Sequence, residues 1–184
     1  MATPTREALI EMLRMMRRIR HFEQRLTGLY DYTSFIKDGD VAGDMYDFAS
    51  KGIIAGAVHL YVGQEAVAVG ICSALNDDDY VTSTHRGHGH AHAHGDTAAK
   101  TPEEKQAHYN KMVAEVLGKT GGYCKGKGGS MHMADTNLNF WGGHAIVGAQ
   151  IPIATGLALG DIYQGNDDAI TICMFGDGAT NIGF

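Results

Sequence analysis

Apolar positions in the first thirty residues recur at helical spacing, between arginines and glutamates. Thr3 can cap a helix, and Pro4 suits the first helical position. The apolar residues that share one face of such a helix are Leu9, Leu13, Met16, Ile19, Leu26 and Leu29. This pattern predicts an opening helix within residues 1–30, with one face packed against the rest of the protein.

Later in the chain, apolar residues form shorter runs with different periods. The β-branched run at 80–84 predicts a strand, and the apolar run at 169–175 predicts a strand buried on both faces. Helical patterns occupy residues 64–75, 101–117 and the small, apolar stretch 148–163. Strands that alternate with helices predict an α/β fold, with a parallel sheet and helices on both of its faces.

Composition narrows the class of protein. The 184 residues suit one domain, and a net charge of −6 argues against a nucleic-acid partner. No apolar run is long enough to span a membrane, so we expect no membrane partner. The three cysteines are too scattered for a disulfide framework, which favours a reducing compartment and makes the cytoplasm our default.

Two segments need separate interpretations. The arginine-rich opening segment contains Glu7, Glu11 and Glu23, whereas targeting presequences are poor in acidic residues, so we predict a packed helix. Residues 31–51 are polar and contain glycine, which indicates an irregular surface insertion.

Twenty-five glycines against three prolines is the unusual feature of the composition. In the Gly176–Asp177–Gly178 turn, a carboxylate could hold a hard cation while the following amides face an anion such as phosphate. A plain surface turn is the alternative. The glycine-rich loop around Lys125 and Lys127 lacks the GxxxxGK[ST] spacing of a nucleotide-binding loop, so a solvated basic loop is the simpler interpretation.

A run of histidines follows the first predicted strand. Imidazoles are common ligands of transition metals, but no carboxylate or thiolate stands at ligand spacing beside His88, His90, His92 and His94. We therefore expect histidines that face solvent or surround an anionic ligand. Arg86 favours the anion, because a guanidinium fork matches phosphate or carboxylate.

Five segments, taken in order, closely resemble one protein family. They are HLYVGQEAVAVG, STHRGHGHA, YCKGKGGSMHMAD, IVGAQIP and GDGATNIG. The family is the alpha subunit of the decarboxylating, thiamine-diphosphate-dependent component of 2-oxo acid dehydrogenase complexes, with pyruvate and acetoin dehydrogenases as the nearest members. The resemblance implies the thiamine-diphosphate-binding, transketolase-like fold. Residues 1–184 would form the N-terminal part of a single such domain, leaving the fold incomplete.

The resemblance also assigns site residues by position. It implies cofactor binding by His85, Arg86, Ala145, Val147, Asp177, Gly178 and Ala179. Asp177 would be a Mg²⁺ ligand, and Arg86 would pair with the cofactor diphosphate. His59 would act in the substrate pocket, with His88 as a second candidate there. Ala145 stands where the family commonly has glycine.

The implied activity is oxidative decarboxylation of pyruvate, with acyl transfer to a lipoyl group, and acetoin cleavage is the alternative. The implied cofactors are thiamine diphosphate and Mg²⁺. The implied partners are a beta subunit, which would supply the activating carboxylate, and a lipoyl-bearing acyltransferase component, with a 2-oxo acid or acetoin as substrate. A two-alpha, two-beta assembly would follow.

Some of the family's ligands have no counterpart in this sequence. The Asn that continues the Mg²⁺ shell and a later diphosphate-binding histidine would both follow Phe184, so we expect a C-terminally truncated subunit that binds cofactor weakly by itself. Two other classes stay open: a metal-handling protein built on the histidine run, and a non-catalytic homologue that only assembles with partners.

Overall fold

Three short strands form a parallel sheet whose carboxyl ends lie at one edge. In the computed structural model, which describes residues 4–30, 54, 58–144 and 146–183, the strand order is β2-β1-β3. The strands are β1 (Tyr80–Ser83), β2 (Phe140–Gly143) and β3 (Thr171–Cys173). Val81 of β1 lies opposite Phe140 of β2 and Ile172 of β3.

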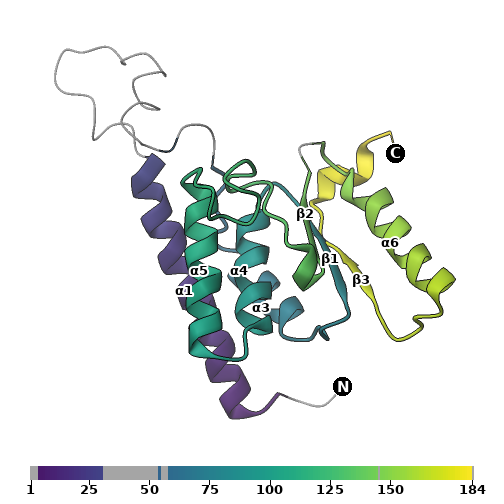
Figure 1. The fold of residues 1–184 in the computed structure, drawn as a ribbon, viewed down its shortest axis with the longest axis horizontal. Helices are drawn as coiled ribbons and strands as arrows, with labels where there is room; N and C mark the ends of the chain where they lie inside the picture. The colour runs from purple at the N-terminus through teal and green to yellow at the C-terminus, as the bar shows by residue number, and fades with distance from the viewer. Residues whose placement is uncertain (1–3, 31–53, 55–57, 145, 184) are drawn as a thin grey trace.

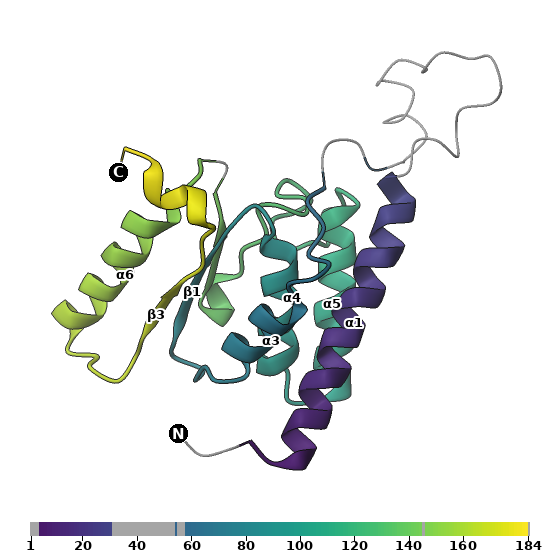
Figure 2. The ribbon, with the colours of Figure 1, turned by 180° about the vertical axis from the view of Figure 1, so that it is seen from behind.

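Helices cover both faces of this sheet (Figure 1). On one side lies α6 (Gln150–Gln164), which contacts β1 and β3. The other side carries α1 (Arg6–Tyr30), α3 (Glu65–Cys72), α4 (Gly87–Ala98) and α5 (Pro102–Val116), and the reverse view shows the same two layers (Figure 2). The predicted α/β class with helices on both faces of a parallel sheet is confirmed.

Local signals place most helices correctly. Thr101 caps α5 through a complete capping box with Glu104, and Pro102 is its first residue, as expected. The opening helix is confirmed as α1, but its predicted apolar face is only partly packed. Ile19 and Leu26 are buried, whereas Leu13 is 53% exposed.

The strand predicted at 169–175 is shorter and more exposed than expected. The ladder covers Thr171–Cys173, each of these residues is half-buried, and Phe175 is 47% exposed. Since β3 is an outer strand of the three, it has a neighbour on one side only. The expectation of burial on both faces was wrong for the described part of the chain.

The histidine run forms α4, and it is buried. His88, His90, His92 and His94 are all at most 7% exposed, so the expectation of solvent-facing histidines was wrong. The physical reason is the small residues between them. A Cβ at Gly89 would overlap the Tyr61 ring, so glycine lets a neighbouring ring lie directly against the helix backbone.

Each of these imidazoles has its own surroundings in the core. His90 Nδ1 lies 2.6 Å from Ser83 Oγ, and His94 Nε2 lies 2.6 Å from the Leu138 carbonyl oxygen. His92 packs edge-on against Phe22. The predicted surface insertion at 31–51 lies outside the described residues.

Candidate active site at the carboxyl ends of the strands

The segments that follow the three strands hold most of the predicted site residues. His85 and Arg86 follow β1, Val147 lies beyond β2, and Asp177 follows β3. Because the strands are parallel, their carboxyl ends share one edge of the sheet, which is where open α/β sheets bind ligands. Figure 1 shows the segment after β3 beside the start of α6 at this edge.

Close backbone packing joins these segments. A Cβ added to Gly148 would lie 3.1 Å from the Ala179 carbonyl oxygen, so the segments after β2 and β3 touch. Gln150 reinforces that contact, because its Nε2 donates to the Met174 carbonyl oxygen at 3.2 Å. A Cβ on Gly143 would lie 2.7 Å from the Met131 carbonyl oxygen, which brings the glycine-rich region to the end of β2.

Arg86 is held in a fixed position beside the candidate site. Its Nη1 donates to the carbonyl oxygen of Leu60, and its backbone N–H donates to Thr84 Oγ1 at 3.1 Å. Among the described residues no carboxylate pairs with its guanidinium. A half-buried guanidinium with free donors is suited to a phosphate or carboxylate ligand.

His85 and His59 face each other beside Arg86. Their ring centroids are 4.8 Å apart and the rings stand at 86°, an edge-to-face arrangement. Partial burial lowers the pKa of His85, and the neighbouring His59 and Arg86 act in the same direction. The lowered pKa favours the neutral form of His85, which can both donate and accept a hydrogen bond.

The turn after β3 presents an open carboxylate. Asp177 begins the short helix η3 (Asp177–Asn181) and is exposed, and no described residue forms an ion pair or hydrogen bond with its carboxylate. Gly178 has nothing within 4 Å of an added Cβ. Ala179 differs, because it is 3% exposed and its N–H donates to the Gly176 carbonyl oxygen at 3.0 Å.

An apolar pair lies exposed between β2 and α6. Ile146 is 63% exposed and Val147 is 60% exposed. Two adjacent exposed aliphatic side chains at a ligand-binding edge offer a surface on which a planar ring could pack. Ala145 lies outside the described residues.

His88 is placed apart from the open edge. Its side chain is fully buried, with Nε2 at 2.9 Å from Glu23 Oε1 and Nδ1 at 3.1 Å from the Ser130 carbonyl oxygen. It therefore has no surface from which to contact a substrate directly. Its position supports a role in holding neighbouring groups.

Comparison with known proteins assigns the chain to a family. The model of the dehydrogenase E1 component family matches residues 42–184. The chain belongs to the dehydrogenase E1 component family.

Named relatives of this E1 chain act on two substrates. It is 40% identical over 155 residues to the alpha subunit of the acetoin:2,6-dichlorophenolindophenol oxidoreductase of Bacillus subtilis, covering 84% of this chain and 43% of that protein. It is 44% identical over 142 residues to the pyruvate dehydrogenase E1 component subunit alpha of Rhizobium meliloti, covering 77% and 36%. With the acetoin oxidoreductase alpha subunit of Cupriavidus necator the identity is 42% over 180 residues, covering 97% and 44%. The E1 chain thus spans less than half the length of these relatives.

The glycine-rich loop of the E1 chain is closed around an internal anion. Glu115 is fully buried, and its two carboxylate oxygens accept four backbone N–H groups. The donors, at 2.7 to 3.2 Å, are Cys124, Gly126, Gly128 and Gly129. The loop amides are therefore occupied, while Lys125 and Lys127 are exposed as predicted.

Sequence reasoning missed Glu23 as a residue of the site's surroundings. Its carboxylate is fully buried on the packed face of α1, between Ile19 and Leu26. The sequence did contain a signal for it. Glu23 lies four residues after Ile19 and three before Leu26, so it falls on the apolar face of the helix and interrupts it. An interruption of that kind indicates a buried partner.

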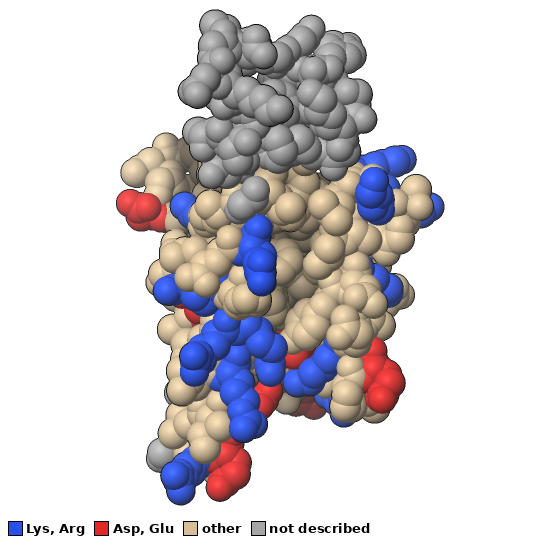
Figure 3. Space-filling view, turned by 90° about the vertical axis from the view of Figure 1, so that its left-hand side faces the viewer, with Lys and Arg blue, Asp and Glu red and all other residues tan. Residues whose placement is uncertain are grey.

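A large groove in the described part of the E1 chain lies elsewhere. A groove of about 690 Å³ runs between α1 and α5, with an apolar floor that includes Phe22 and Met112. Arginines of α1, among them Arg17 and Arg25, border it, and Figure 3 shows basic side chains gathered on this face. The groove is not formed by the strand ends, so it is separate from the candidate site.

Metal handling and membrane insertion find no support in the described part of the E1 chain. No three His, Cys, Asp or Glu side chains there are grouped so that they could hold a metal ion. The buried histidines of α4 instead contact separate neighbours. None of the described helices has the length and apolar character needed to cross a bilayer.

Proposed function

We propose that this E1 chain forms the diphosphate-and-Mg²⁺ side of a thiamine-diphosphate site, in the alpha subunit of a 2-oxo acid dehydrogenase. The activity would be oxidative decarboxylation of pyruvate, with acyl transfer to a lipoyl group. One observation carries the proposal. The Arg86 guanidinium, which pairs with no carboxylate among the described residues, and the open turn at Asp177 follow adjacent parallel strands in a chain of the E1 family.

The residues present fit this cofactor. Asp177 would hold Mg²⁺, and Gly178 would let the diphosphate approach the backbone because its surroundings are open. Arg86 would pair with the diphosphate oxygens from a position fixed by Leu60. Ala179, with its N–H already bonded within the turn, would contribute shape rather than a donor.

The remaining site residues would line the pocket. Val147 would pack against the aminopyrimidine ring together with Ile146 and the backbone of Ala145. His59 and His85 would offer imidazole nitrogens to the substrate carbonyl or carboxylate. When bound, thiamine diphosphate supplies the electron sink that decarboxylation of a 2-oxo acid requires.

Partners complete the proposed assembly. We place the chain beside a beta subunit that supplies the activating carboxylate, and a lipoyl-bearing component that accepts the acyl group. The domain would adopt the transketolase-like fold. The three free thiols support a reducing compartment such as the cytoplasm.

Acetoin cleavage is the second candidate. The observation that favours it is 40% and 42% identity to two alpha subunits named as acetoin oxidoreductases, beside 44% to a pyruvate dehydrogenase subunit. Identities this close do not separate the two substrates. A direct assay with both substrates therefore decides.

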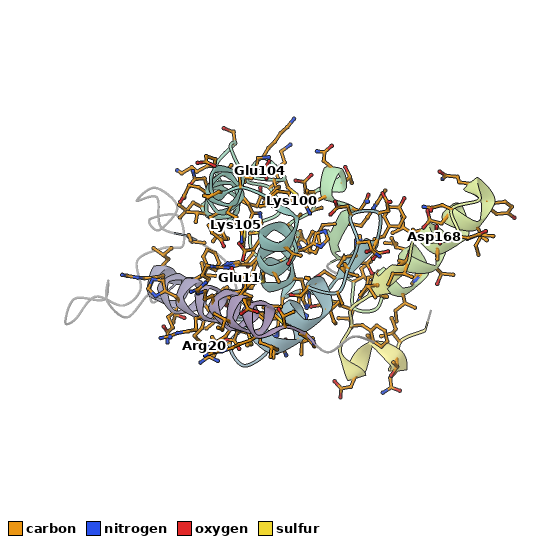
Figure 4. All side chains as sticks on the ribbon, turned by 90° about the horizontal axis from the view of Figure 1, so that it is seen from below. Glu11, Arg20, Lys100, Glu104, Lys105 and Asp168 are labelled. Atoms are coloured by element: carbon orange, nitrogen blue, oxygen red, sulfur yellow. The ribbon has the colours of Figure 1, made fainter. Side chains whose placement is uncertain are left out.

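The test compares two exposed aspartates at opposite ends of β3. The chain is assembled with a beta subunit, and thiamine diphosphate binding is measured by calorimetry with Mg²⁺, followed by dye reduction with pyruvate and acetoin. Asp177→Ala should weaken cofactor binding by about 10- to 100-fold, because a Mg²⁺ ligand is lost. Asp168→Ala, in the connection from α6 to β3 (Figure 4), should leave it unchanged.

Three other outcomes have defined meanings. Equal effects of the two substitutions would contradict the assigned role of Asp177. Cofactor binding without turnover would point to the non-catalytic homologue. Tight Mg²⁺-dependent binding by the chain alone would overturn the expectation that it binds the cofactor weakly by itself.

A further inference from the structure

Glu23 is a fully buried carboxylate with partners on two different segments. Its Oε2 accepts the backbone N–H of Tyr61 at 2.7 Å, and its Oε1 lies 2.9 Å from His88 Nε2. A buried carboxylate is costly unless it is paired, and the Tyr61 N–H and the His88 imidazole are the groups that face this one. Neither contact belongs to a helix or sheet ladder.

The segment that Glu23 binds leads directly to the candidate site. His59, Leu60 and Tyr61 have no regular secondary structure, and each makes a different contact. The His59 ring faces His85, the Leu60 carbonyl oxygen accepts from Arg86, and the Tyr61 N–H donates to Glu23. Tyr61 is itself fully buried, so this end of the segment is the fixed one.

The second partner of Glu23 leads to the same place from the other side. His88 lies two residues after Arg86, in the first turn of α4. Its Nδ1 and its backbone N–H both approach the Ser130 carbonyl oxygen, at 3.1 Å and 3.2 Å. The His88 ring therefore lies between the Glu23 carboxylate and the Ser130 carbonyl oxygen.

We propose that Glu23 is a positioning residue for this site. Its carboxylate holds the 59–61 segment, whose Leu60 carbonyl fixes the Arg86 guanidinium. Through His88 it also holds the helix turn from which Arg86 projects. The carboxylate thereby fixes both sides of Arg86 and the backbone that carries His59. The effect on cofactor binding rests on the proposed function, whereas the effect on the 59–61 segment does not.

The experiment compares Glu23→Gln with Asp96→Asn in the chain assembled with a beta subunit. Asp96 is a matched control because it too is a buried carboxylate between α1 and α4, bound to Arg18 at 2.6 Å. Its network continues through Lys105 of α5 to Glu11 of α1. Both residues are labelled in Figure 4. Among the described residues, this network does not include 59–61.

Two measurements follow from this design. Hydrogen exchange of a peptide covering residues 59–61 should speed up by at least about tenfold in Glu23→Gln and stay unchanged in Asp96→Asn. Thiamine diphosphate affinity with Mg²⁺ should fall by at least about tenfold in Glu23→Gln only, because a misplaced guanidinium loses its paired geometry. The shorter side chain of Glu23→Asp can reach one of the two partners. Its exchange rate and its cofactor affinity should therefore lie between those of the unsubstituted protein and Glu23→Gln.

The outcomes separate the two proposals. If the unsubstituted assembly binds no thiamine diphosphate, the proposed function fails, and the exchange data still test Glu23. Equal changes in both variants, or an unchanged 59–61 peptide in Glu23→Gln, would overturn the positioning role. If Glu23→Gln does not fold, the unsubstituted protein decides, because a rapidly exchanging Tyr61 amide would contradict the Glu23 contact.

Discussion

The loop at residues 124–129 and the turn at residues 176–178 look alike in sequence and differ in structure. Both are glycine-rich and carry charged side chains. The first is closed, with four of its amides bound to the buried Glu115 carboxylate. The second is open, with an exposed Asp177 and free space beside Gly178.

The two segments differ in what their backbone N–H groups and charged side chains bind. Glycine-rich loops can present several N–H groups to one anion, whether that anion is a ligand or a side chain. In the closed loop the chain supplies the anion, so the result is structural stability. In the open turn the Asp177 carboxylate has no partner among the described residues, so the result is a capacity to bind.

Removing the internal anion should have the largest effect. Glu115→Gln replaces one oxygen by an NH₂ group that faces backbone donors, so two buried amides lose their acceptor. We expect a loss of roughly 2–5 kcal/mol in the free energy of unfolding, measured by denaturant titration. Asp177→Asn, the matched change in the open turn, should stay within about 0.5 kcal/mol. A similar loss in both would remove the distinction between the two loops.

Glycine substitutions should also destabilise the protein more in the closed loop than in the open turn. Gly126 has a φ of +75°, and an added Cβ would overlap the backbone of Gly118. Gly126→Ala should therefore cost roughly 2–4 kcal/mol of unfolding free energy. Gly178→Ala meets open space and should change stability by less than about 1 kcal/mol. The measurement is thermal unfolding of the two variants. A lower melting temperature for Gly178→Ala than for Gly126→Ala would contradict this expectation.

Acid should lower the stability of the protein through a buried histidine beside the closed loop. Burial lowers the pKa of His108 to about 4, and this side chain hydrogen-bonds the Tyr123 hydroxyl beside the loop. In the unfolded state His108 has its ordinary pKa of about 6.5. Between pH 6.5 and about 4 the unfolded state therefore binds more protons than the folded state. The free energy of unfolding consequently decreases as the pH falls below about 6.5. His108→Gln should shrink the loss of stability between pH 7.5 and 5.5 by about 1 kcal/mol. An identical pH dependence in the variant would contradict this assignment.

The lysines of the closed loop should matter least. Lys125 and Lys127 are exposed and have no ion pair among the described residues, and the loop amides are already bound to Glu115. Lys125→Ala and Lys127→Ala should each change the unfolding free energy by less than about 0.5 kcal/mol. A larger loss would mean that the loop depends on a charge outside its carboxylate core.

Sequence patterns predicted the features that depend on neighbouring residues. Thr101 and Glu104 form a capping box within four positions and Pro102 begins the helix, so the start of α5 follows from local chemistry. The strand ends could also be predicted, because parallel strands place their carboxyl ends together. The candidate residues His85, Arg86 and Asp177 accordingly fall at one edge.

Contacts between distant residues could not be predicted in this way. Helix α4 consists mostly of glycine, alanine and histidine, and nothing in its periodicity shows that rings from Tyr61 and His108 lie against it. The contact between Arg86 and Leu60 spans 26 positions, and that between Glu23 and Tyr61 spans 38. Tertiary packing decides such pairs.

Helix α4 also has a consequence for mutational tolerance. Aromatic rings pack directly against Gly89 and Gly95. An added Cβ would overlap the Tyr61 ring at Gly89 and the His108 ring at Gly95. A segment whose composition resembles a permissive linker should therefore accept almost no substitution. In a saturation scan, these two glycines would stand among the least variable positions of the chain, with a sensitivity set by the shape of their neighbours.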